Sequence, residues 1–207
     1  MTADEIARLF QRSDGSFLCA RWGRAVVPVV FGVEPATLAV VKGAIEAVCA
    51  LARHQVDRVD PELGANLMVF FCRDWEDLRG VPNLGRLIDG FGPLLDRLAA
   101  TEANQYRVFR FDEAGAIRAA FVFLRMDAHL SALPAEVLAL HQAVQVILLW
   151  SDRAFTEVSP LADAGGRVIL RPEVGAVIRA AYDPVLPGVA RDPVHALRLA
   201  ARVGAVQ

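Results

Sequence analysis

Apolar residues recur along the chain with two different periods, and the periods separate predicted helices from predicted strands. Within residues 35–54 they follow steps of three and four, which is typical of one buried helix face: Leu38, Val41, Ile45, Val48 and Ala52. Residues 65–72 form an apolar run, with Asn66 as its single polar residue, which predicts a buried strand. Residues 106–111 and 117–126 flank a Gly-containing turn and predict a hairpin. We expect 117–126 to be an edge strand of the sheet.

The other segments carry weaker signals of the same kind. Pro134 and Glu136 suit the first turn of a helix that we expect to reach about Trp150. Additional elements are predicted as follows: helices over 2–12, 93–100, 172–181 and 193–203, strands over 17–21 and 26–31, and loops or irregular chain over 60–64, 73–90 and 156–170. The predicted fold class is α+β, a mixed β-sheet covered by helices with a C-terminal helical segment, in a single domain spanning 1–207.

Composition narrows the classes of protein to which the chain can belong. Of 207 residues, 55% are hydrophobic and 22% charged, which is typical of a globular chain. The net charge is −2 and Lys42 is the single lysine, so we expect no nucleic-acid partner. Residues 1–6 lack the features of a signal peptide and no apolar run reaches 18 residues, so we expect a cytoplasmic protein without membrane association. Three scattered cysteines, Cys19, Cys49 and Cys72, are expected to be buried reduced thiols.

The pentapeptide from His141 to Gln145 is the most informative motif. It has the spacing of the zinc-protease helix H-E-x-x-H, in which two histidines bind zinc and the glutamate acts as a general base. Here Gln142 takes the place of the glutamate and Gln145 the place of the second histidine. Asp152 is one residue away from the offset of a third ligand. We therefore expect no metal, and the absence of a glycine-rich phosphate loop indicates no nucleotide cofactor.

The C-terminal third resembles a family through several short motifs. These are Gln145 to Asp152, Ser159, Leu170 to Glu173, and Ile178 to Gly188 with its Tyr182-Asp183-Pro184 segment. They are similar to an uncharacterised alphaproteobacterial family of unknown function that has a zincin-like, or metalloprotease-like, fold. His141 and Gln142 replace two glutamates of that family's pattern. The resemblance implies a zincin-like fold whose helix is degenerate, and it implies no activity.

Several side chains are candidates for a cleft or an interface. His141, Gln142, Gln145, Asp152, Tyr182 and Asp183 form a candidate degenerate cleft. Asp183 before Pro184 is also an ordinary helix stop. Arg21, Trp22 and Arg24 form a candidate recognition loop, since Trp and Arg are enriched at interaction hot spots, or an ordinary hairpin edge. Trp150 joins them as an interaction candidate, together with Val177, Ile178 and Tyr182 as an apolar surface or dimer contact.

These observations favour a non-catalytic interaction or scaffold protein that binds a protein partner or a second copy of itself. A cleft beside an edge strand can accept an added strand from a partner. Two alternatives stay open at this point. One is an enzyme of unrecognised chemistry that uses His141 as acid/base with Asp152 or Asp183 to orient it, and the other is a small-molecule sensor with a closed apolar pocket.

Overall fold

A four-stranded mixed sheet forms the centre of the computed structural model, which describes residues 1–58 and 64–204. Its strands run in the order β2 (Pro28–Phe31), β3 (Leu67–Cys72), β5 (Ile117–Arg125) and β4 (Gln105–Phe111). β2, β3 and β5 are parallel, and β4 pairs antiparallel with β5 as the predicted hairpin. The α+β class with a mixed sheet is thus confirmed. The prediction that 117–126 is an edge strand is wrong, because β5 lies between β3 and β4.

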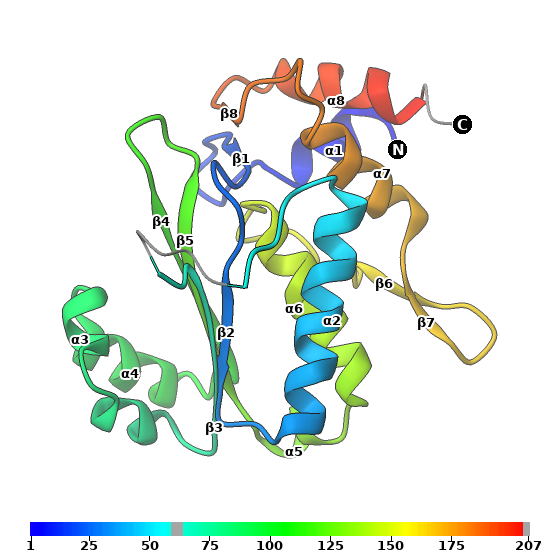
Figure 1. Ribbon diagram of the computed structural model, residues 1–207. Helices are drawn as coiled ribbons and strands as arrows, with labels where there is room; N and C mark the ends of the chain where they lie inside the picture. The colour runs from blue at the N-terminus through cyan, green and yellow to red at the C-terminus, as the bar shows by residue number, and fades with distance from the viewer. Residues whose placement is uncertain (59–63, 205–207) are drawn as a thin grey trace.

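Helices cover both faces of this sheet (Figure 1). α2 (Pro35–Leu51) and α6 (Ala135–Ile147) lie on one face and share a core with Leu67 and Val69. A short 3-10 helix η1 (Trp75–Gly80), α3 (Leu84–Leu87) and α4 (Phe91–Ala100) cover the other face over Phe70 and Cys72. Because alternate residues of β3 are buried on opposite faces, its sequence is apolar without interruption.

The two ends of the described chain meet at one end of the sheet. There α1 (Ala3–Arg8), α7 (Pro172–Ala181) and α8 (His195–Gly204) pack together (Figure 1). Ile6, Phe10 and Leu199 are fully buried between these helices and the core. Nearby, β1 (Cys19–Ala20) pairs antiparallel with β8 (Val189–Ala190). The predicted C-terminal helical segment is therefore confirmed, and it anchors the N-terminal helix.

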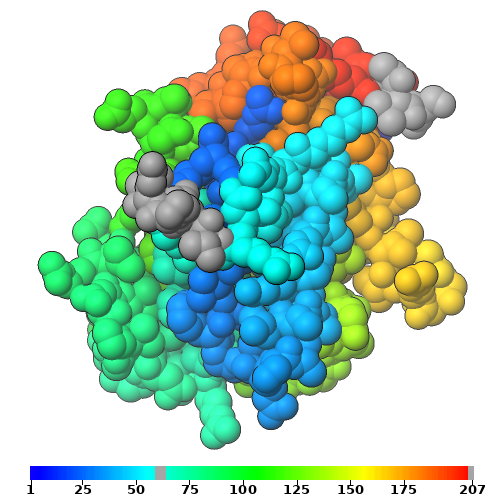
Figure 2. Space-filling model, viewed as in Figure 1, coloured from blue at the N-terminus to red at the C-terminus, as the bar shows by residue number. Residues whose placement is uncertain are grey.

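Some segments that lack a periodic pattern are nevertheless ordered. Residues 156–170, predicted to be irregular, contain a hairpin of β6 (Leu161–Asp163) and β7 (Val168–Leu170) that stands out from the body (Figures 1 and 2). The predicted loop 73–90 contains η1 and α3, and the short helix α5 (Ala128–Ser131) was not expected. These elements are only three to six residues long, so no period could develop in them. Most of the predicted loop 60–64 lies outside the described residues.

Gly32 shows how tightly the ends of two parallel strands are packed. It follows β2 directly and has a φ of +80°, which is a conformation that favours glycine. A Cβ atom at this position would lie 2.0 Å from the carbonyl oxygen of Phe71 in β3. The turn from β2 into α2 therefore requires glycine for both its backbone angle and its closeness to the neighbouring strand.

The three cysteines are buried and form no disulfide, as expected. Burial raises the pKa of Cys19 and of Cys49 to about 12, and that of Cys72 to about 11. These thiols are therefore protonated and poorly nucleophilic at neutral pH. In the described part of the chain, no helix combines the length and apolar character that crossing a bilayer requires.

Candidate functional site

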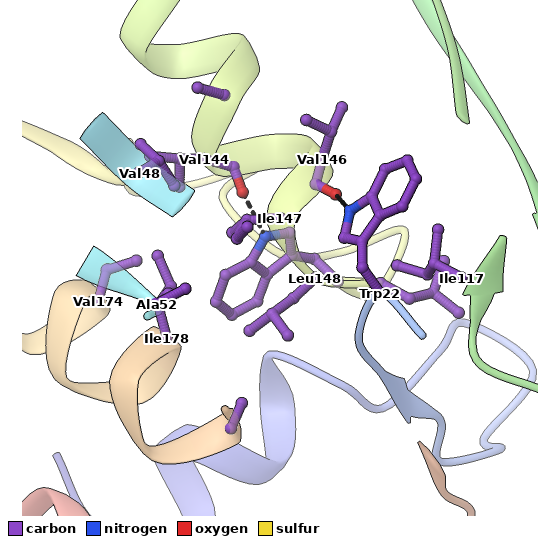
Figure 3. Close-up of a cluster of buried hydrophobic side chains, with 14 of the residues drawn as sticks. Trp22, Val48, Ala52, Ile117, Val144, Val146, Ile147, Leu148, Val174 and Ile178 are labelled. Carbon is purple, nitrogen blue, oxygen red and sulfur yellow. Dashed lines mark hydrogen bonds between the residues drawn. The ribbon is translucent and has the colours of Figure 1, made fainter. Parts of the chain in front are cut away.

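The helix that carries His141 and Gln142 ends earlier than predicted, and three aromatic donors mark its end. α6 stops at Ile147, not near Trp150. The last carbonyls of a helix lack partners within it and need donors from elsewhere. Trp150 Nε1 donates to the carbonyl of Val144 and Trp22 Nε1 to that of Val146, both at 2.8 Å (Figure 3). The hydroxyl of Tyr182 donates to the carbonyl of Ile147, also at 2.8 Å.

Beyond Ile147 the chain is extended and joins β1. Leu148 forms an antiparallel bridge with Arg21, and the backbone N–H of Leu149 donates to the carbonyl of Ala20 at 2.9 Å. Trp150 then stacks on Phe10 with a ring separation of 5.3 Å. Residues 20–21 thus pair with the chain directly after the end of the helix. The amphipathic pattern of α6 contains no sign of this pairing.

The candidate interaction residues are largely buried and make contacts within the chain. Trp22 and Trp150 are buried, as are Val177 and Ile178. The guanidinium of Arg21 donates to the carbonyls of Ala181, Asp183 and Leu186 and so holds the end of α7. Arg21 also lies 5.5 Å from the ring centre of Tyr182. Half-buried Arg24 accepts a hydrogen bond at its carbonyl from His54, at 2.8 Å.

His141 and Gln142 belong to a polar cluster between α6 and the edge strand β4. Arg107 Nη2 donates to Gln142 Oε1 at 2.9 Å and to Gln105 Oε1 at 2.7 Å. Gln142 Nε2 donates to Gln105 Oε1 at 3.2 Å and lies 3.4 Å from Nδ1 of His141. We refer to Gln105, Arg107, His141 and Gln142 as the glutamine–arginine cluster. The strand register explains why Arg107 lies on the side of α6. Arg107 pairs with Val122, and the side chain of Val122 faces α2 and α6.

Burial determines the charges in this cluster. It lowers the pKa of His141 to about 4, with a further contribution from the nearby positive charge of Arg107. His141 is therefore neutral at pH 7. Burial also lowers the pKa of Arg107 to about 10, so the guanidinium stays charged at neutral pH. The cluster thus carries one positive charge among neutral amides and a neutral imidazole.

A cleft of about 330 Å³ opens beside this cluster. It lies between α5 and α6, the first residue of β4, and the β6–β7 hairpin. Its apolar wall consists of Leu130, Leu133, Val137, Leu138, Leu161, Ala162 and Val168. Its polar wall consists of Gln105, His129, His141, Gln142, Ser159 and Asp163. Asp163 accepts a hydrogen bond from the backbone N–H of Gly166 within the turn of the hairpin, at 2.6 Å.

The other candidate cleft residues lie elsewhere. Exposed Asp152 accepts two hydrogen bonds from Ser13, one from its backbone N–H at 2.9 Å and one from its hydroxyl. Asp183 accepts from Arg202 at 2.5 Å. Tyr182 and Asp183 line a second cleft, of about 410 Å³, at the ends of α2 and α7. Gln145 is half-buried on α6, and its side chain forms no hydrogen bond with another described residue. Gln142, and not Gln145, is thus the glutamine whose side chain lies beside that of His141.

The chemistry available in the first cleft is that of hydrogen bonding. Over residues 1–58 and 64–204, no three His, Cys, Asp or Glu side chains are placed to share a metal ion. Ser159 Oγ accepts from the backbone N–H of Leu161 at 3.1 Å, and no hydrogen bond joins it to His141 in the described chain. The groups that face the cleft can therefore bind a ligand, but no nucleophile and base are paired among them.

Two members of the cluster, Gln105 and Arg107, were not singled out from the sequence. The available signal was the alternation of β4. It places Gln105, Arg107 and Phe109 on the face that packs against α2 and α6, here called the inner face, and Tyr106 and Val108 on the face covered by η1, α3 and α4. An arginine at an inner strand position is a departure from the pattern. Neither a protein-family model, nor a curated protein, nor a solved structure matches the chain. Its function has to be inferred from the cleft itself.

Proposed function

We propose that the protein is a non-catalytic interaction protein that binds a segment of a partner protein in the cleft beside the glutamine–arginine cluster. One observation carries the proposal: this cleft has an apolar wall on one side and hydrogen-bonding amides on the other, beside the edge strand β4. Apolar pockets with a few convergent polar groups are typical of binding sites. A peptide segment with apolar side chains suits both walls, because its side chains are apolar and its backbone is polar.

The surroundings of His141 support binding over catalysis. A general acid/base is most effective when its pKa lies near the working pH, and the pKa of His141 is about 4. Its nearest side-chain partner is the amide of Gln142, which cannot stabilise a protonated imidazole as a carboxylate does. Asp152 and Asp183, the two carboxylates considered as its partners, are bonded to Ser13 and Arg202.

The edge strand gives a partner segment a second set of contacts. β4 has a neighbour on one side only, so its outward backbone groups are free to pair with an added strand. Gln105, its first residue, lines the cleft. A segment that enters the cleft at Gln105 and continues along β4 would combine specific side-chain contacts with backbone hydrogen bonds.

The zincin-like ancestry of the helix is part of the same proposal. Proteases bind their substrates as extended strands beside the active-site helix. The supporting points are that α6 carries His141 and Gln142 on the side of a cleft and that this cleft adjoins an edge strand. On this hypothesis the protein has kept the substrate-binding geometry of such an enzyme and lost the zinc ligands.

The second cleft is a weaker candidate because its polar groups are already satisfied. Arg202 pairs with Asp183, and the hydroxyl of Tyr182 is bonded to the carbonyl of Ile147. Arg53 and Arg179 lie at the C-terminal ends of α2 and α7, where positive charge stabilises the helix dipole.

The test is a selection of random peptides on the purified protein. Leu133→Arg fills the apolar wall of the cleft with a charged side chain, and Leu87→Arg is a matched control at an exposed position outside it. We expect selected peptides to bind the wild type and Leu87→Arg equally and Leu133→Arg at least tenfold more weakly. Peptides that bind all three alike, or peptides that the wild type cleaves and His141→Gln does not, would overturn the proposal.

A further inference from the structure

Arg107 is a half-buried cation that has no anionic partner in the described part of the chain. Its Nη2 is bonded only to the neutral amide oxygens of Gln105 and Gln142. Its Nε is buried and has no hydrogen-bond partner among residues 1–58 and 64–204. Across the described residues no carboxylate forms an ion pair with it. A guanidinium in this setting has lost much of its hydration and has regained only part of the electrostatic stabilisation.

Buried charges in proteins are normally paired, so an unpaired one requires an explanation. Two other partly buried arginines of this chain follow the rule. Arg202 is bonded to the carboxylate of Asp183, and Arg125 lies 3.9 Å from that of Asp127. Arg21, which has no carboxylate, donates to three backbone carbonyls. Arg107 differs in having a buried Nε without a partner among the described residues, while the two glutamines bonded to its Nη2 line a cleft.

Arg107 does not itself line the cleft, and a ligand reaches it only past the glutamines bonded to its Nη2. Gln105 and Gln142, whose oxygens hold Arg107, both line the cleft. Gln105 is half-buried at the start of an edge strand, and capture of a ligand by Arg107 requires its side chain to turn away from the guanidinium. A carboxylate that replaced Gln105 Oε1 would give Arg107 a charged acceptor, and charge-assisted hydrogen bonds of this kind are about twice as strong as neutral ones.

The neighbouring groups are also suited to an anion. If Gln142 Nε2 donates to Nδ1 of His141, the neutral imidazole carries its proton on Nε2, which is then a second donor. His129 adds a further ring to the wall, and the single carboxylate there, Asp163, is held by the hairpin turn. Apart from Gln105 and Ser159, the rest of the wall is aliphatic. The complementary ligand therefore has one carboxylate attached to an apolar group.

We infer that the cleft captures the C-terminal carboxylate of a peptide that ends in an apolar residue. This inference rests on the proposed function and specifies the kind of segment that is bound. Recognition of a chain terminus by donors within a pocket is a common binding mode. The terminal carboxylate pairs with Arg107, the last side chain occupies the space lined by Leu133, Val137 and Leu161, and the preceding residues continue along β4.

The experiment compares two peptide libraries that differ only at the end. Both are random octapeptides with C-terminal leucine, one with a free carboxylate and the other amidated, and hexanoate is a third probe. We expect the free-carboxylate pool to bind ten- to a hundredfold more tightly than the amidated pool. Arg107→Met, which removes the buried charge and keeps the apolar stem, should abolish this difference and retain the fold.

The outcomes separate the two proposals. Equal binding of both pools in the cleft, unaffected by Arg107→Met, would overturn carboxylate capture and leave the interaction function standing. Absence of binding by either pool would overturn both. Binding of hexanoate with the same dependence on Arg107, but of neither pool, would assign the carboxylate site to a free aliphatic acid and overturn the peptide proposal. Gln105→Ala is a second variant, and it should keep the preference for a free carboxylate.

Discussion

Arg107 Nη2 lies 2.9 Å from Gln142 Oε1, so the residue in the position of a zinc-protease glutamate is a neutral acceptor for a buried arginine. A glutamate there would neutralise Arg107. The glutamine leaves the positive charge unpaired and next to a cleft. This single pair therefore links the degenerate helix motif to the proposed binding chemistry.

Changing Gln142 to glutamate should give Arg107 an anionic partner inside the protein and so compete with a bound carboxylate. The new carboxylate would accept the hydrogen bond from Arg107, and we expect the free energy of unfolding at pH 7 to rise by about 1 kcal/mol. Its pKa would be depressed by Arg107, so the gain is present above about pH 4.3 and is lost as the pH falls through the folded-state pKa. Peptides with a free carboxylate should bind about tenfold more weakly. Gln145→Glu, one turn away, is the matched control and should show neither effect.

The protein should lose stability on mild acidification because of His141. Its pKa is about 4 in the folded state against an ordinary value of 6.5. Below pH 6.5 the unfolded chain binds a proton at His141 that the folded chain does not. Stability is therefore unaffected by this group above pH 6.5, and it decreases as the pH falls from 6.5 toward 4. The contribution of this group should fall by roughly 2 kcal/mol between pH 7 and pH 5.

Urea unfolding at the two pH values measures this effect, with His141→Gln as the comparison. His54 and His195 also have lowered pKa values, mainly through burial. They add equally to the pH dependence of the free energy of unfolding in the wild type and in the variant. The variant should therefore lose about 2 kcal/mol less than the wild type. Identical slopes would show that His141 is not desolvated as described.

Trp22→Phe should weaken the last turn of α6. It removes the donor to the carbonyl of Val146 and leaves a buried acceptor unpaired, at a cost of about 1 to 3 kcal/mol. Hydrogen exchange of the amides near residues 144–147 should become faster. Trp75→Phe removes a similar bond to the carbonyl of Ala103 on the other face of the sheet and should leave α6 exchange unchanged. Unaltered exchange in Trp22→Phe would contradict the capping role.

Gly32 and Gly43 should respond in opposite ways to alanine. Gly32→Ala places a Cβ 2.0 Å from the carbonyl of Phe71 at a φ of +80°, and we expect a loss of at least about 3 kcal/mol or failure to fold. Gly43 is exposed within α2, where nothing lies within 4 Å of a new Cβ. Gly43→Ala should stabilise by about 0.5 to 1 kcal/mol. Thermal unfolding of both variants measures this contrast. A Gly32→Ala variant that is as stable as the wild type would contradict it.

Long periodic segments were predictable from the sequence, and contacts between distant segments were not. α2 and the β4–β5 hairpin were predicted because Val41, Ile45 and Val48, or the alternating residues of β4, repeat often enough to define a face. For Trp22 the sequence left a recognition loop and an ordinary hairpin edge both open, because its actual partner, the carbonyl of Val146, is 124 residues away in the chain. Arg107 joined the candidate site only through strand pairing and the packing of α6 on the sheet.

The side-chain Nε–H resonance of Arg107 gives the most direct test of the proposed site. A terminal carboxylate that replaces Gln105 Oε1 beside Nη2 would give the guanidinium an anionic partner, and the chemical shift of the adjoining Nε–H reports this change. On titration with a selected free-carboxylate peptide, we expect this resonance to shift downfield and its exchange with water to slow, with no change for the amidated peptide. A peptide that binds while the Arg107 Nε–H resonance stays unmoved would contradict carboxylate capture at this cleft.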